Sequence, residues 1–138
     1  MSGQNIGSLG AEGATLHQFT PDGRWLVVRT TGEFRLWEVG SWKPGPAWPF
    51  PPGSHAMARI SFSPDGRVVA LPQTTQQFQL IDLRTLAEVA NLPVPKQIHD
   101  AVWSHDGQRL YLLAVDNHVF EWDFPALRRQ LASLGLDW

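Results

Sequence analysis

The sequence predicts an all-β fold: three consecutive four-stranded antiparallel units, followed by one short helix. Three observations carry this prediction. A turn motif recurs with a nearly constant period, a second anchor repeats at the same period, and short β-branched and aromatic runs separate the anchors. Runs of this kind between Asp-Gly and Asp-Asn turns are typical of antiparallel hairpins.

The turn motif is Phe-Thr-Pro-Asp-Gly-Arg at 19–24, which recurs at 62–67 as Phe-Ser-Pro-Asp-Gly-Arg and at 103–108 as Trp-Ser-His-Asp-Gly-Gln. Its glycines are 43 and then 41 residues apart. The second anchor is an apolar residue followed by an acid, with spacings of 44 and 41 residues. The anchor residues are Asp22, Gly23, Trp37, Asp65, Gly66, Ile81, Asp106, Gly107 and Trp122. Two anchors with one period indicate an internal repeat.

Each unit contains strand-like runs on both sides of its turns. The first strands are expected at 16–19, 60–62 and 98–103, the second at 25–28, 68–71 and 110–113, and the third at 34–37, 78–81 and 119–122. The first two units have a fourth run, at 47–50 and 87–92. Four strands in about 40–45 residues is the period of a β-propeller blade.

These residues resemble the WD-repeat (WD40) family from about Thr15 to Phe124. The resemblance implies a β-propeller and a non-catalytic protein-interaction scaffold. It also implies a buried network of His, Ser, Asp and Trp in each well-formed blade. In the third unit only Asp116 and Trp122 match that network, and Leu112 occupies the serine position. Similar Pro-Asp-Gly boxes occur in the propellers of periplasmic translocation proteins and of some peptidases.

The expected organisation follows the repeat. It comprises an N-terminal segment at 1–14, blade 1 at 15–56, blade 2 at 57–96, blade 3 at 97–124 without its own outer strand, and a C-terminal helix at 125–138. Pro125 suits the first helical turn, Leu127, Leu131 and Leu134 form one apolar stripe, and Gly135 favours a C-terminal stop. Asn5–Leu9 is the expected ring-closing strand, paired with 119–122.

Three blades do not close a ring, because propellers typically need four to eight. The first and third blades are therefore expected to carry large apolar flanks. We expect two copies of the chain to join as a six-bladed homodimer, since the sequence starts with Met and ends after a capped helix. The alternatives are the last blades of a longer, kinase- or peptidase-associated protein, and a ligand- or glycan-binding propeller.

No motif for catalysis or for a cofactor is present in the sequence. There is no cysteine, P-loop, dinucleotide fingerprint or nucleophile elbow. His17, His55, His99, His105 and His118 form no close-spaced ligand pairs, so no metal site is expected. The aspartates of the repeated turns are expected to cap those turns. We predict no enzyme activity and no cofactor.

Charge and hydropathy bear on partners and location. The net charge is −2 and no basic cluster is present, so neither nucleic acid nor an anionic membrane is an expected partner. No signal peptide or membrane-length apolar run is found, and a cytoplasmic location is the default expectation. The sequence does not identify the protein partner.

The proline-rich segment 40–54 holds the candidate partner contacts, Trp42, Trp48 and Phe50. Its five prolines predict an edge strand between rigid loops. Exposed aromatic side chains on a stiff segment lose little entropy when they bind. The alternative is that Trp48 and Phe50 pack on the outer strand of their own blade.

Overall fold

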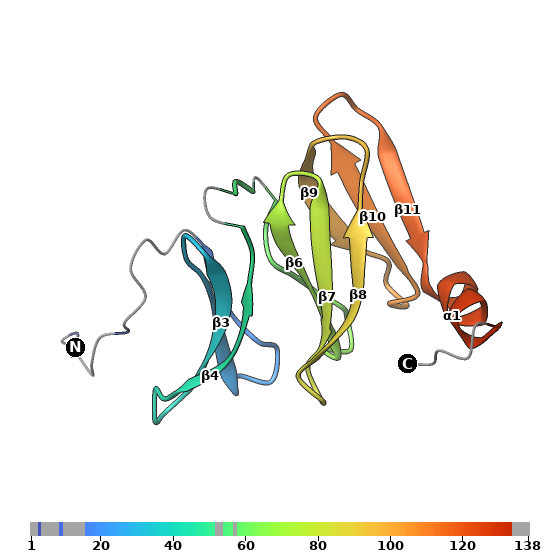
Figure 1. Ribbon diagram of the computed structural model, residues 1–138. Coiled ribbons are helices and arrows are strands. Elements are labelled where there is room, and N and C mark those ends of the chain that lie inside the picture. Colours follow the sequence, from blue (N-terminus) through green and yellow to red (C-terminus); the bar gives the residue numbers. More distant parts are fainter. Residues whose placement is uncertain (1–2, 4–8, 10–15, 52–53, 57, 134–138) are drawn as a thin grey trace.

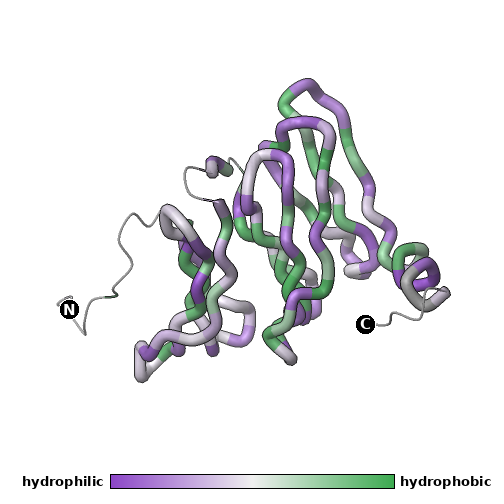
Figure 2. The backbone as a smooth tube through the Cα atoms, in the orientation of Figure 1, coloured by the Kyte–Doolittle hydropathy of each residue, from purple (hydrophilic) through white to green (hydrophobic). Residues whose placement is uncertain are grey.

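The computed structural model describes residues 3, 9, 16–51, 54–56 and 58–133, apart from the side chains of residues 131 and 132. Within these residues, eleven strands form three antiparallel sheets that lie side by side, and one helix follows the last strand (Figure 1). Hydrophobic positions concentrate along the strands, and hydrophilic positions at the turns (Figure 2).

Consecutive strands pair within each sheet. The first sheet comprises β1 (Leu16–Phe19), β2 (Trp25–Arg29), β3 (Glu33–Glu38) and β4 (Pro44–Pro49). The second comprises β5 (Ser61–Phe62), β6 (Val68–Thr74), β7 (Gln77–Asp82) and β8 (Ala87–Pro93). The third comprises β9 (Ile98–Trp103), β10 (Arg109–Ala114) and β11 (Val119–Asp123). The predicted fold class and strand order are therefore confirmed.

The third sheet has three strands in the described part of the chain, as the sequence predicts. The expected partner of β11 is Asn5–Leu9, of which residues 5–8 lie outside the described residues. So do Leu134 and Gly135 of the predicted helix and its C-terminal stop. The helix α1 (Phe124–Ser133) starts where Asp123 Oδ1 accepts the backbone N–H of Ala126 at 3.1 Å, which is a typical N-cap.

The glycine of each repeated turn has a positive φ, between 70° and 72°. Glycine adopts this conformation without the penalty that a Cβ atom brings. At Gly66 an added Cβ would lie 3.3 Å from Pro21 Cβ, and at Gly107 3.5 Å from Pro64 Cδ. Each of these two turns therefore lies directly against the preceding turn.

Each sheet has two faces, defined here by the alternating side chains of its second strand. The leading face carries Leu26 and Val28 in the first sheet, Val69 and Leu71 in the second, and Leu110 and Leu112 in the third. The trailing face carries Trp25 and Val27, then Val68 and Ala70, then Arg109 and Tyr111. Side chains paired across strands share a face, because successive residues of a strand point to opposite sides.

Two hydrophobic cores fill the seams between sheets. In the first seam, the trailing face of the first sheet packs on the leading face of the second, with Leu36 and Leu71 fully buried. In the second seam, the trailing face of the second sheet packs on the leading face of the third, with Leu80 and Leu112 fully buried. The stacking therefore has one direction throughout.

The trailing face of the third sheet is not the apolar flank that the sequence led us to expect. Arg109 Nε lies 3.0 Å from Glu121 Oε1 and 3.9 Å from Asp123 Oδ2 across β10 and β11. Val102 and Val119 on the same face are 46% and 61% exposed. This face thus combines charged and apolar side chains and is covered by no further sheet among the described residues.

A buried arginine crosses the first seam. Arg29 Nη2 donates to the carbonyl oxygen of Gln73 at 2.9 Å and to that of Ser54 at 3.1 Å. The guanidinium also lies 4.3 Å from the ring centroid of Phe50. Burial lowers the pKa of Arg29, because the apolar surroundings disfavour its charge. The hydrogen bonds and the aromatic ring offset that desolvation cost.

Replacing Arg29 by methionine should lower the free energy of unfolding by about 2 kcal/mol, since one buried and one partly buried carbonyl group would lose a charged donor. Urea unfolding followed by tryptophan fluorescence measures the change. The matched control is Arg24→Met, at an exposed position, which should change the stability by less than about 0.5 kcal/mol. Equal effects of the two substitutions would contradict the role given to Arg29.

Candidate functional site

A groove runs along the first strands of the three sheets. It has a volume of about 440 Å³ and is lined by residues of all three units: Gln18, Phe19, Pro21, Arg59, Ile60, Ser61, Phe62, Ser63 and Ala101. The backbone positions this groove, because β5 has two residues and leaves the segment before it free of strand pairing. It is the candidate interaction site of the described chain.

Arg59 supplies the charge of the groove. Its side chain is 79% exposed, and Nη2 lies 3.4 Å from Asp100 Oδ2 at the first strand of the third sheet. An exposed pair at this distance is weak and contributes little to stability. The next residue, Ile60, is buried in the first seam and also lines the groove. An exposed guanidinium of this kind can bind a carboxylate.

The proline-rich segment forms the edge strand β4, as predicted, but its three aromatic side chains do not form one surface. Phe50 is 5% exposed and meets Phe34 edge-on, with 5.6 Å between the ring centroids. Trp48 is half-buried against the same core, which favours the packing interpretation for both residues. Trp42 lies beyond the other end of β4, half-buried, with a φ of 56°.

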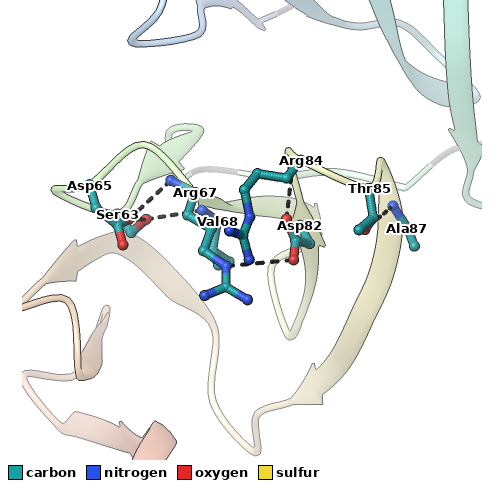
Figure 3. A network of polar contacts seen from close by, with 8 residues as sticks. All are labelled: Ser63, Asp65, Arg67, Val68, Asp82, Arg84, Thr85 and Ala87. Carbon is teal, nitrogen blue, oxygen red and sulfur yellow. Dashed lines mark hydrogen bonds and ion pairs between the residues drawn. The ribbon is translucent and has the colours of Figure 1, made fainter. Parts of the chain in front are cut away.

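The aspartates of the repeated turns are engaged within their own turns. Asp65 Oδ1 accepts the Ser63 hydroxyl at 2.7 Å and the backbone N–H of Arg67 at 3.0 Å (Figure 3). Asp22 and Asp106 make the same pair of bonds. In all three aspartates the pKa of the carboxyl group is lowered, and the main cause is the hydrogen bond from the Ser or Thr hydroxyl.

The acidic residue that follows each apolar anchor (Trp37, Ile81 or Trp122) binds the backbone or a side chain of the segment after it. Asp82 Oδ1 accepts the backbone N–H of Arg84 at 2.8 Å, and Oδ2 lies 3.6 Å from Arg67 Nε (Figure 3). Glu38 Oε1 accepts the Ser41 hydroxyl in the first sheet, and Asp123 caps α1 in the third. The recurrence of an acid at this position thus has a local structural cause.

Asp116 does not take part in a buried network in the described structure. Its carboxylate is exposed and contacts Lys96 Nζ at 3.0 Å and His118 Nδ1 at 2.9 Å. Leu112, at the expected serine position, is fully buried in the second seam. The pKa of Asp116 is lowered to about 2, mainly by the hydrogen bond from the Lys96 side chain and next by that from His118.

The two tryptophan anchors occupy equivalent positions on leading faces. Trp122 is half-buried against the second core. Trp37 is 9% exposed and belongs to neither core, and its indole N–H has no hydrogen-bond partner among the described atoms. By contrast, Trp103 Nε1 donates to the carbonyl of Ser61 in the preceding sheet at 3.1 Å.

A smaller cavity of about 170 Å³ lies between the end of β8 and β11, lined by Pro93, Val94, Pro95, Phe120, Glu121 and Trp122. Among the described residues, no group of three or more His, Asp or Glu side chains is placed to hold a metal ion. No helix in the same part of the chain is long and apolar enough to cross a membrane.

Comparison with solved structures identifies the architecture. The β-propeller domain of Cps50 (Swd1) from Myceliophteria thermophila is similar over 87% of this chain, with a TM-score of 0.69 and 14% sequence identity. The three sheets are blades of a β-propeller. This chain spans 38% of that propeller domain, and the likeness concerns the fold. No protein-family model and no curated protein matches the sequence.

Sequence reasoning did not find the groove between the blades or the buried Arg29. The groove combines residues of blades whose equivalent positions are more than 40 residues apart, so no local pattern marks it. One feature of the sequence does point to Arg29. It is a charged residue at the end of an apolar strand, at the position where blades 2 and 3 have the uncharged Pro72 and Leu113.

The pKa of Asp116 should rise from about 2 toward 3.8 in a Lys96→Met variant, because the largest cause of its low value is removed. Carboxyl-detected NMR titration measures it. In the wild-type chain the low folded-state pKa stabilises the fold above the unfolded value of 3.8, and that stabilisation is lost as the pH falls toward 2. Asp106, which is bonded to Ser104, serves as the internal control and should not shift.

Proposed function

We propose that these blades belong to a non-catalytic protein-interaction scaffold, and that the groove along the first strands is its contact surface. The observation that carries the proposal is the exposed guanidinium of Arg59 in a groove lined by all three blades. Arg59 lies on the unpaired segment before β5, and residues of β1 and β9 line the groove on either side of it.

The groove suits a protein segment that carries a carboxylate beside an apolar side chain. Arg59 offers a planar donor fork for the carboxylate, and its existing pair with Asp100 is long enough to be exchanged. Phe62 and the exposed Phe19 offer apolar contact along the segment. A charged group beside apolar side chains gives orientation as well as affinity, as is usual for binding sites in proteins.

Ring closure requires blades in addition to the three of this chain. These come either from a second copy, which would give the six-bladed homodimer expected from the sequence, or from another polypeptide segment. The scaffold proposal holds with either source of blades.

An Arg59→Glu substitution should reduce recovery of a specific protein partner at least about tenfold, which corresponds to the loss of about 1.4 kcal/mol at a binding hot spot. Immobilised wild-type and variant chains are compared by quantitative mass spectrometry of the proteins they retain. Arg84→Glu, an equal charge reversal on an exposed turn, is the matched control.

Two results would contradict this assignment. One is retention that is unchanged in Arg59→Glu but lost in Trp42→Ala, which would move the contact to the proline-rich segment. The other is that the folded wild-type chain retains no more protein than an unfolded control. This control is the Arg29→Met variant in urea.

A further inference from the structure

One position of the repeat carries a different kind of side chain in each blade. It lies seven residues before the glycine of the repeated turn, and it is Leu16 in blade 1, Arg59 in blade 2 and Asp100 in blade 3. Leu16 is half-buried against the first core. Arg59 lines the groove, and Asp100 directly precedes Ala101, which lines it too. The repeat thus places a cation and an anion at equivalent positions of two adjacent blades.

The two charged side chains are held differently. Asp100 Oδ1 accepts the backbone N–H of Ala101 at 2.9 Å, and the Asp100 side chain is 27% exposed. The Arg59 side chain is 79% exposed, and its contact of 3.4 Å with Asp100 Oδ2 is its one polar contact within the described part of the chain. The guanidinium can therefore turn away from Asp100, while the carboxylate keeps its place.

A ligand that offers only a carboxylate would disturb this arrangement. It would draw Arg59 away from Asp100, which has no second ion-pair partner among the described residues. The partly buried Asp100 would then keep its charge without a cation, and it would repel the incoming carboxylate. Both effects weaken the binding of an acidic group on its own.

A ligand that offers a base beside its acid avoids both effects. Its carboxylate pairs with Arg59 and its cationic group pairs with Asp100, so each charge at the groove exchanges one partner for another. The groove volume of about 440 Å³ is typical of sites that enclose more than one side chain. In an extended chain alternate residues point to the same side, so an acid and a base two residues apart reach the groove together.

We propose that the groove recognises an extended protein segment with an acidic and a basic residue two positions apart, the acid at Arg59 and the base at Asp100. Blade 1 contributes the exposed Phe19 to the same groove, so the order of contacts along the segment is apolar, acidic, basic. The inference rests on the proposed function and specifies the chemistry of the partner at that site.

The test uses short peptides whose ends are acetylated and amidated, so that they carry no terminal charge. Phe-Ala-Glu-Ala-Lys and the reversed Lys-Ala-Glu-Ala-Phe have the proposed order in the two possible chain directions. NMR titration of the isotope-labelled full chain, followed at the amide signals of Ser61 and Ala101, gives the dissociation constants. For the peptide that binds more tightly, replacement of its Lys by Gln should weaken binding at least about tenfold.

Two variants of the chain assign that difference to its residues. Asp100→Asn removes the charge but keeps an acceptor for the Ala101 N–H, and it should bind the Lys and the Gln peptide with equal affinity. Arg59→Gln should no longer distinguish Glu from Gln in the peptide. The matched control is Asp116→Asn, at an exposed carboxylate that does not line the groove, and it should retain the tenfold difference.

A peptide with exchanged charges, Phe-Ala-Lys-Ala-Glu, should bind the wild type as weakly as the Gln peptide. The inference is overturned if this peptide or the Gln peptide binds as tightly as the Lys peptide, or if the difference persists in Asp100→Asn. Absence of any shift at Ser61 and Ala101 also overturns it. The proposed contact surface fails as well only if Arg59→Glu leaves partner retention unchanged, so the two failures can be told apart.

Discussion

The sheets of this protein depend on apolar burial against one another. Leu36 and Leu80 reach full burial because the next sheet covers them, and within a single sheet they would face water. Burial of a leucine side chain stabilises the fold by roughly 1.5–3 kcal/mol. Since short antiparallel sheets are marginal alone, the stability of this chain lies in its seams rather than in its individual strands.

Each seam adds one directional contact to this nonspecific burial. In the first seam Arg29 donates to the Gln73 carbonyl, and in the second the Trp103 indole donates to the Ser61 carbonyl. Apolar burial alone tolerates sliding of one sheet over the next. A hydrogen bond at a fixed backbone atom does not, so these contacts set the relative position of adjacent blades. The two seams use different residues for this purpose.

The strands could be predicted from the sequence because their signals are local. The Asp-Gly turns and the alternation of side chains place β2 and β3, β6 and β7, and β10 and β11 to within about three residues. The start of the helix also follows from local chemistry, since Asp123 accepts an N–H of the first turn. The alternation of side chains and the repeat period were therefore sufficient to predict the fold class and the number of sheets.

The surfaces could not be predicted in the same way, because they depend on contacts between repeats. Phe50 was a candidate for exposure, but Arg29 and Phe34 draw it into the first seam. Asp116 occupies the position expected for a buried network, yet its carboxylate is exposed and pairs with Lys96, which lies between β8 and β9. The groove at Arg59 exists only when first strands of different units stand side by side.

The close approach of Gly66 to Pro21 and of Gly107 to Pro64 limits what these two positions can carry. Because no side chain stands at either glycine, the turn of one blade can lie directly against the proline of the preceding turn. A Cβ atom at Gly66 would stand 3.3 Å from Pro21, so a larger residue there would push two neighbouring blades apart at their turns. In the third turn His105 stands where the first two turns have this proline, which gives that turn a larger and more polar surface.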